Sequence, residues 1–125
     1  MSTYQGRRQK NGTAWVTVQA TTPNGAPKLR RLPLGPSLRL FNHSPTGFEW
    51  GYGGSGPAQL ALAILLHYAG AEGRHSASWA VRHHQAFKWH FVANWHKDGF
   101  VLHTEEIDVW VRSLDAKGDD HESRP

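Results

Sequence analysis

The sequence contains no cysteine among its 125 residues. This absence excludes a disulfide framework and any chemistry that needs a thiolate, and it agrees with the cytoplasmic location that we expect. Long hydrophobic runs are absent as well. The longest, Leu60–Leu66, is far below the roughly 20 residues of a membrane-spanning helix, and residues 1–12 lack the apolar stretch of a signal peptide. We therefore expect neither a membrane span nor a secretion signal.

Acidic residues are missing from the first 48 residues, which carry seven basic ones. The remaining residues hold seven basic and ten acidic residues, so the net charge of +4 hides a marked asymmetry. A basic half of this kind attracts phosphates or an acidic protein surface. The alternative is a solvated basic face that only improves solubility.

The length suits a single domain, which we place at residues 4–114. Polar and charged composition at both ends predicts flexible termini at residues 1–3 and 115–125. No internal repeat or low-complexity tract divides the chain.

The first half of the sequence predicts strands. Apolar residues alternate with polar ones over Thr13–Ala20, which is typical of a half-buried strand. Tyr4 anchors a preceding short strand, Lys28–Leu34 and Leu38–Asn42 are expected to follow as further strands, and Phe100–Leu102 is a short extended segment late in the chain.

The second half predicts three helices. The first, Pro57–Ala69, is apolar almost all round and should be the most buried element, with Gly70 as its C-terminal stop. The second spans about Ala77–Lys97 after a serine cap, and the third begins at a capping Thr104. Its buried stripe consists of Ile107, Trp110, Val111 and Leu114. The expected fold class is α+β, with a small antiparallel sheet from the N-terminal half packed against about three helices from the C-terminal half.

A glycine-rich and aromatic turn, residues 48–56, leads directly into the first helix. Pro57 suits the first helical position, which makes Gly56 the expected N-cap and lets Gln59 reach back to the cap N–H. Free N–H groups at Ser55–Ala58 favour a bound anion. The competing interpretation is a close turn that lets the helix pack against the sheet.

The segment from Asn42 to Leu65, NHSPTGFEWGYGGSGPAQLALAIL, resembles the signature of a small domain family of unknown function. Tyr4–Arg7 and Gln85–Val92 resemble its flanking pieces. The family occurs in bacteria and archaea, often in phages and other mobile elements. The resemblance therefore implies a mobile-element context, and it implies no activity and no functional residues.

Catalytic and metal-binding patterns are weak. Ser55 lies between glycines, but Pro57 stands where the hydrolase elbow needs glycine, and the Lys-Ser/Thr pair of a phosphate-binding loop is missing. An enzyme using His43, Glu49 and Ser55 is supported only by their closeness in sequence. A metal site built from His43, His83 and His90 lacks the usual i, i+4 spacing. We expect no cofactor, no metal and no catalytic residue.

Tryptophan, tyrosine and arginine are frequent anchors in recognition surfaces. We expect Trp110 and either Trp89 or Trp95 to be largely core, whereas Trp15 stands on the polar side of its strand and is available for recognition. The predicted binding residues are Arg30, Arg31, Arg39, Trp50, Tyr52, Gly54 and Ser55.

The function expected from these observations is a non-enzymatic binding protein of a phage or mobile element. Its partner is expected to be a host or phage protein, with inhibition of a host defence system as one form of the activity. The alternative is direct binding of nucleic acid through the basic sheet face and exposed aromatics, for which the affinity would fall steeply with salt.

Overall fold

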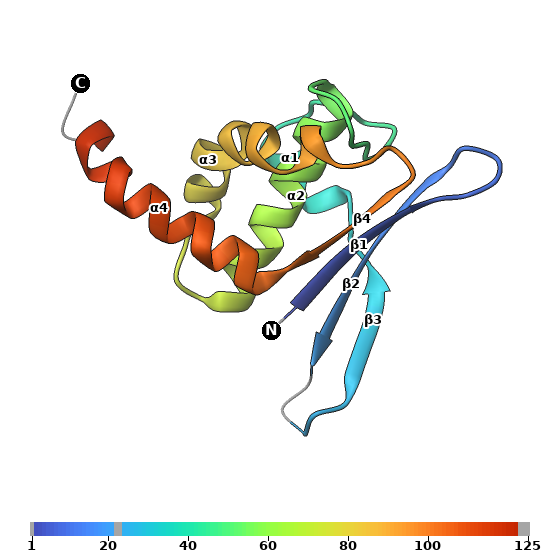
Figure 1. The fold of residues 1–125 in the computed structure, drawn as a ribbon, viewed down its shortest axis with the longest axis horizontal. Helices are drawn as coiled ribbons and strands as arrows, with labels where there is room; N and C mark the ends of the chain where they lie inside the picture. Colours follow the sequence, from blue (N-terminus) through green and yellow to red (C-terminus); the bar gives the residue numbers. More distant parts are fainter. Residues whose placement is uncertain (1, 22–23, 123–125) are drawn as a thin grey trace.

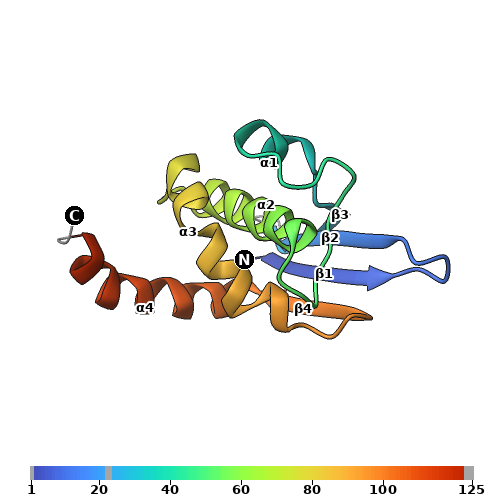
Figure 2. The same cartoon turned by 90° about the horizontal axis from the view of Figure 1, so that it is seen from above.

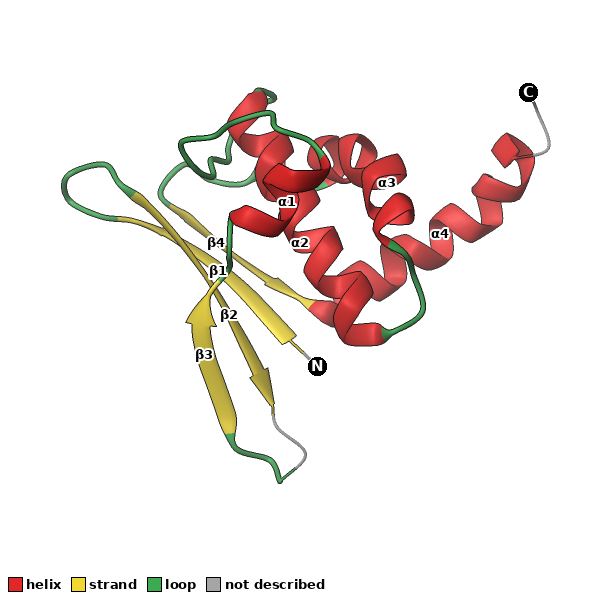
Figure 3. Ribbon diagram, turned by 180° about the vertical axis from the view of Figure 1, so that it is seen from behind, coloured by secondary structure: helices red, strands yellow, loops and turns green. Residues whose placement is uncertain are grey.

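The computed structural model describes residues 2–21 and 24–122, with side chains as far as Leu114 in the last helix. A four-stranded antiparallel sheet in the order β3-β2-β1-β4 carries the helices on one face (Figures 1 and 3). This confirms the predicted α+β class. The elements are β1 (Ser2–Arg8), β2 (Ala14–Thr21), β3 (Pro27–Arg31), α1 (Gly35–Leu40), α2 (Ser55–Glu72), α3 (Ala77–His90), a 3₁₀ turn (Val92–Asn94), β4 (Gly99–His103) and α4 (Thr104–Glu122).

The sheet has one buried and one open face. Along β2, Val16 and Val18 are buried while Trp15 and Gln19 are exposed, as the alternation predicts. β4 comes from the C-terminal half of the chain and pairs with β1, so that Tyr4 lies opposite Leu102 in the register. The predicted late extended segment is therefore an edge strand of the same sheet.

Helix α2 is the centre of the core, as predicted: every side chain from Leu60 to Leu65 is buried. Its predicted ends are wrong. The N-cap is Gly54 rather than Gly56, and the helix continues through Gly70 to Gly73, whose φ of 70° is left-handed and whose N–H donates to the carbonyl of Ala69. A left-handed C-terminal residue of this kind is the usual role of glycine at a helix end.

Gln59 does not reach back to the N-cap, contrary to the sequence prediction. Its Oε1 accepts hydrogen bonds from the backbone N–H groups of His43 (2.7 Å) and Ser44 (3.0 Å). Its Nε2 donates to Ser37 Oγ and to the carbonyl of Phe41. The fully buried amide therefore holds the segment before the glycine-rich turn against α2.

The predicted strand Leu38–Asn42 is wrong, because residues from Gly35 to Leu40 form the short helix α1. Pro36 occupies its first turn, where the missing N–H has no helical partner. Ser37 is buried and donates to the carbonyl of Leu34, which closes the first turn.

Helix α3 begins as expected, with Ser76 Oγ accepting from the N–H of Trp79. It ends at His90 rather than near Lys97, and the amide of Asn94 donates to the last carbonyls of the helix. The expected stripe of α4 packs on the core, with Ile107, Trp110 and Val111 buried and Leu114 partly so.

Thr104, which the sequence predicts as the cap of α4, is the first residue of that helix. Its hydroxyl donates to the carbonyl of Ser2 and accepts from the N–H of the same residue, which ties the start of α4 to the start of β1. The side chain of Glu106 accepts instead from the N–H of His103. An acidic residue three positions into the helix therefore supplies half of a capping box.

Regular structure extends into both segments for which flexible termini are predicted. β1 begins at Ser2, and the backbone of α4 runs to Glu122 and projects away from the body of the domain (Figure 2). Residues 1 and 123–125 lie outside the described residues, and the flexibility of the ends stays a prediction. No helix in the described ranges is long and apolar enough to cross a membrane.

Candidate functional site

The uncovered side of the sheet, called here the open face, is formed by the side chains that alternate with the buried ones. Its outward positions are Thr3, Gln5 and Arg7 in β1, Trp15, Thr17, Gln19 and Thr21 in β2, Pro27, Leu29 and Arg31 in β3, and Gly99, Val101 and His103 in β4. None of them is acidic. The helices lie on the opposite side of the sheet (Figure 3), so this face is available to a partner.

An aromatic and cationic pair stands on the open face. The indole of Trp15 is 40% exposed, and the Cζ atom of Arg31 lies 4.1 Å from its ring centroid. Arg7 is the register partner of Trp15 on the neighbouring strand and is also exposed. The cation–π contact contributes about 0.5–1 kcal/mol at an exposed site, which holds the indole and the guanidinium together in one place.

The structure separates the predicted binding arginines. Arg30 lies opposite the buried Val18 in the register and therefore points to the helical side of β3. There it contributes, after burial itself, to lowering the pKa of His67. Arg39 is exposed on α1. Of the three arginines, only Arg31 belongs to the open face.

Trp50 is a core residue. It is 1% exposed, its Nε1 donates to the carbonyl of His96, and its ring packs edge-on against Phe100. A recognition role for this side chain would require its removal from the core. Trp89, by contrast, is 58% exposed, while Trp95 stacks on Phe100 and packs against the core.

A polar cleft of about 560 Å³ lies beside the start of α2, between the β1–β2 turn and the glycine-rich turn. Tyr52, which is 51% exposed, and Ser55 line this cleft. Gly54 lies under the Tyr52 ring, where a Cβ would come within 2.5 Å of the ring carbon Cε2. The predicted residues of the turn therefore gather on the helical side of the sheet, away from the open face.

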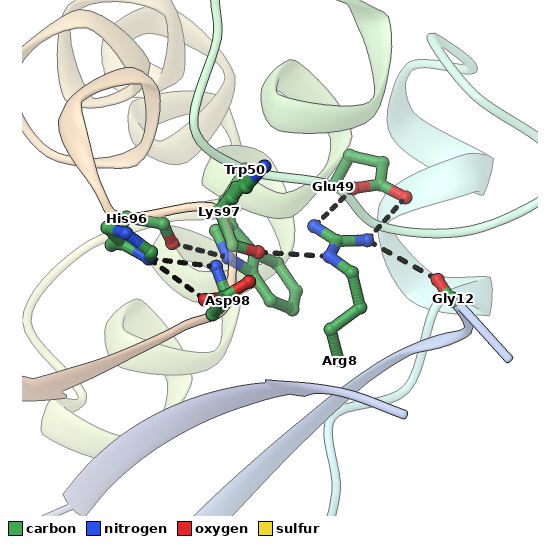
Figure 4. Close-up of polar contacts among 7 residues, drawn as sticks. All are labelled: Arg8, Gly12, Glu49, Trp50, His96, Lys97 and Asp98. Carbon is green, nitrogen blue, oxygen red and sulfur yellow. Dashed lines mark hydrogen bonds and ion pairs between the residues drawn. The ribbon is translucent and has the colours of Figure 1, made fainter. Parts of the chain in front are cut away.

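Glu49, which lines the cleft, forms an ion pair with Arg8 (Figure 4). The guanidinium donates to both carboxylate oxygens, at 2.9 and 3.2 Å, and its Nε donates to the carbonyl of Lys97. The same guanidinium lies 4.7 Å from the ring centroid of Trp50. This cluster joins β1, the glycine-rich turn and the segment before β4, so it is primarily a structural clamp.

His43 pairs with His84, a contact that sequence patterns do not reveal because the two residues are far apart in the chain. Their Nε2 atoms are 2.9 Å apart. His84 Nδ1 lies 2.6 Å from the carbonyl of Val81, which can only accept. When both rings are neutral, His84 Nε2 is therefore the acceptor and His43 Nε2 the donor. Burial lowers the pKa of both histidines, and the charge of Lys88 lowers them further.

The contacts of His43 and Glu49 are relevant to the two alternatives considered from the sequence, an enzyme site and a metal site. Among the described residues, no group of three or more histidine or acidic side chains is placed to hold a metal ion. His43 is bonded to His84, and Glu49 to Arg8. No hydrogen bond among the described residues joins either of them to Ser55.

The fold and the open face define a small α+β domain with one uncovered sheet surface. The chain belongs to DUF6166, a family of unknown function whose model matches residues 4–113. This confirms the resemblance to an uncharacterised family. No curated protein and no solved structure matches the chain.

Proposed function

We propose that the protein is a non-catalytic binding protein whose contact surface is the open face. The observation that carries the proposal is the pair formed by Trp15 and Arg31 on a sheet surface that none of the described helices covers. Exposed tryptophan and arginine are the side chains that most often anchor recognition. A cation held against an indole is partly ordered before binding, which reduces the entropic cost of association.

The proposed setting is a phage or other mobile element, acting in the cytoplasm of its host, and the family resemblance supports it. Inhibition of a host defence system by occlusion of one of its components is one form that such binding would take. From the sequence alone, a host or phage protein is the expected partner and nucleic acid is the alternative. The composition of the open face favours nucleic acid.

The proposal is tested by capture of partners from a host lysate with a Trp15→Ala/Arg31→Gln variant beside the wild type. The matched control, Trp89→Ala/Arg112→Gln, removes an exposed tryptophan and an arginine from the helical side. We expect at least one partner to be lost only with the open-face variant, and to bind again when purified separately. Partners retained equally by both variants would contradict the proposal.

A further inference from the structure

We infer that the macromolecule bound by the open face is a single-stranded nucleic acid. The inference rests on the proposed function, because it names the ligand class for the same surface. Three properties of the open face carry it: a stacking platform, cations without acidic neighbours, and a polar centre.

The stacking platform is the pair of Trp15 and Arg31. An unpaired base has two flat π faces, and it stacks favourably on an aromatic ring or on a guanidinium plane. Part of the indole is open to solvent, and the guanidinium of Arg31 lies against it, so both kinds of platform are present at one point. In a duplex the bases are stacked on one another, and this platform would have nothing to bind. The ligand is therefore single-stranded.

The cations supply charge complementarity with a phosphate backbone. Arg7 and Arg31 are exposed on the open face, and neither forms an ion pair within the described ranges of the chain. Arg8, next in sequence to Arg7, points to the other side of the sheet, where Glu49 neutralises it. In the described part of the chain, the positive charge of Arg7 and Arg31 on the open face is therefore not neutralised by an ion pair, whereas the charge of Arg8 on the helical side is.

The centre of the open face is polar. Gln5, Thr17 and Gln19 stand on the two inner strands and offer both donors and acceptors to the edges of unpaired bases. Apart from Trp15 on the inner strand β2, the large exposed apolar side chains of the face are Leu29 and Val101, which lie on the two edge strands. Protein interfaces usually show the opposite arrangement, with an apolar centre and a polar rim.

A second copy of this chain is a poor occupant for the same surface. Face-to-face pairing would bring the arginines of one copy toward those of the other, with no carboxylate on either open face to compensate. Like charges across an interface disfavour association. The charge pattern therefore selects an anionic ligand rather than self-association.

The test is fluorescence anisotropy with labelled oligothymidylate, oligouridylate and a duplex of mixed sequence, each titrated with the whole protein at several salt concentrations. Trp15→Ala removes the stacking ring, Trp15→Phe keeps an aromatic ring, and Arg7→Gln/Arg31→Gln removes the two cations. The matched controls are Trp89→Ala and Arg74→Gln/Arg112→Gln, which make the same changes on the helical side. Circular dichroism confirms that each variant is folded.

We expect the wild type to bind at least one of the single strands more tightly than the duplex. Trp15→Ala should weaken binding about 5- to 150-fold, the range for loss of one stacked base, while Trp15→Phe should recover most of it. Arg7→Gln/Arg31→Gln should reduce the slope of log affinity against log salt by about 1.4, since each phosphate contact with a single strand contributes about 0.7. The control variants should bind as the wild type does.

Three results would overturn the inference: no binding of either oligonucleotide at low salt, equal or tighter binding of the duplex, or binding that the open-face variants leave unchanged. Capture of partners from nuclease-treated lysate distinguishes failure of this inference from failure of the proposed function. A purified protein partner that depends on Trp15 and Arg31 would overturn only the choice of nucleic acid. Absence of any ligand that depends on the open face would overturn both.

Discussion

At the scale of single residues, the side chain of Gln59 makes hydrogen bonds that sequence patterns do not reveal. Its amide group is buried within α2 and bonds four partners in residues 37–44. A buried amide is favourable only when its donors and acceptors are paired. The position of the segment that contains α1 and His43 therefore depends on this one side chain.

Replacing Gln59 by leucine should lower the free energy of unfolding by about 2–4 kcal/mol, because the N–H groups of His43 and Ser44 lose their acceptor and the cost of an unsatisfied group is about 1–3 kcal/mol. Urea denaturation measures the change. The control is Gln85→Leu, the same substitution at an exposed position of α3. An equal effect of the two substitutions would contradict the role assigned to Gln59.

The histidine pair makes stability depend on pH. Burial and the neighbouring charge of Lys88 lower the pKa of both His43 and His84 in the folded protein. As the pH falls through about 6.5, the unfolded chain therefore takes up protons that the folded chain does not. The contribution of these two histidines to stability is fully present above this pH. It is lost as the pH falls toward the pKa values that they have in the folded protein. Protonation also removes the acceptor at His84 Nε2.

We expect urea midpoints to fall between neutral and mildly acidic pH, and to fall less in His84→Gln, which cannot titrate. Some pH dependence should remain in that variant, because burial and the charge of Arg30 lower the pKa of His67, which contacts the hydroxyl of Tyr4. Urea unfolding at several pH values gives the slope of midpoint against pH for the wild type and for the variant. Identical slopes for wild type and variant would show that the pair does not control the effect.

At the scale of elements, the two glycines near the end of α2 provide a test of where the helix stops. Gly73→Ala should destabilise the protein by about 1 kcal/mol, because alanine resists the left-handed conformation that Gly73 adopts. Gly70→Ala should stabilise it by about 0.5–1 kcal/mol, since Gly70 lies inside the helix with open space where a Cβ would be. Thermal unfolding distinguishes the two signs. The reverse result would place the stop at Gly70.

Local patterns predicted the strands of the sheet and the three long helices, with wrong ends for α2 and α3, and failed for the short helix α1. The alternation of Thr13–Ala20 and the apolar run that follows Pro57 each predict an element that exists. Leu38 and Leu40 suggest alternation, yet they lie in the six-residue helix α1. A helix of this length has little stability of its own. The contact between Ser37 and Gln59, distant in sequence, selects its conformation.

At the scale of the whole molecule, the cluster around Arg8 joins three separate segments (Figure 4). Arg8→Met should lower the free energy of unfolding by about 1–3 kcal/mol, since it removes charge-assisted hydrogen bonds to Glu49 and to the carbonyl of Lys97. Arg7→Met is the matched control on the opposite side of the same strand. Chemical denaturation gives both values. A double-mutant cycle with Glu49→Gln isolates the ion pair, and a coupling near zero would contradict the clamp.

Also at the scale of the whole molecule, the sequence predicted only some of the residues that the structure brings together on the open face. The sequence identified Arg31 and Trp15 as available for recognition, and the structure places both on the open face. Arg30, Trp50 and Tyr52 were also predicted as binding residues, but none of them lies on the open face. Arg30 points to the helical side, Trp50 is in the core, and Tyr52 borders the cleft. Proximity along a chain does not specify which side of a sheet a side chain occupies.

The sequence by itself determined the α+β class, the single buried helix α2, the alternation of β2, and the charge asymmetry, because each of these follows from composition or periodicity within a short window. Only the tertiary structure decided that β4 joins β1, that Gln59 and His84 hold residues 37–44, and that Trp15 and Arg31 share an uncovered face. These features depend on contacts between segments remote in the chain, and such contacts form only when the whole sheet and α2 bury their apolar surfaces together.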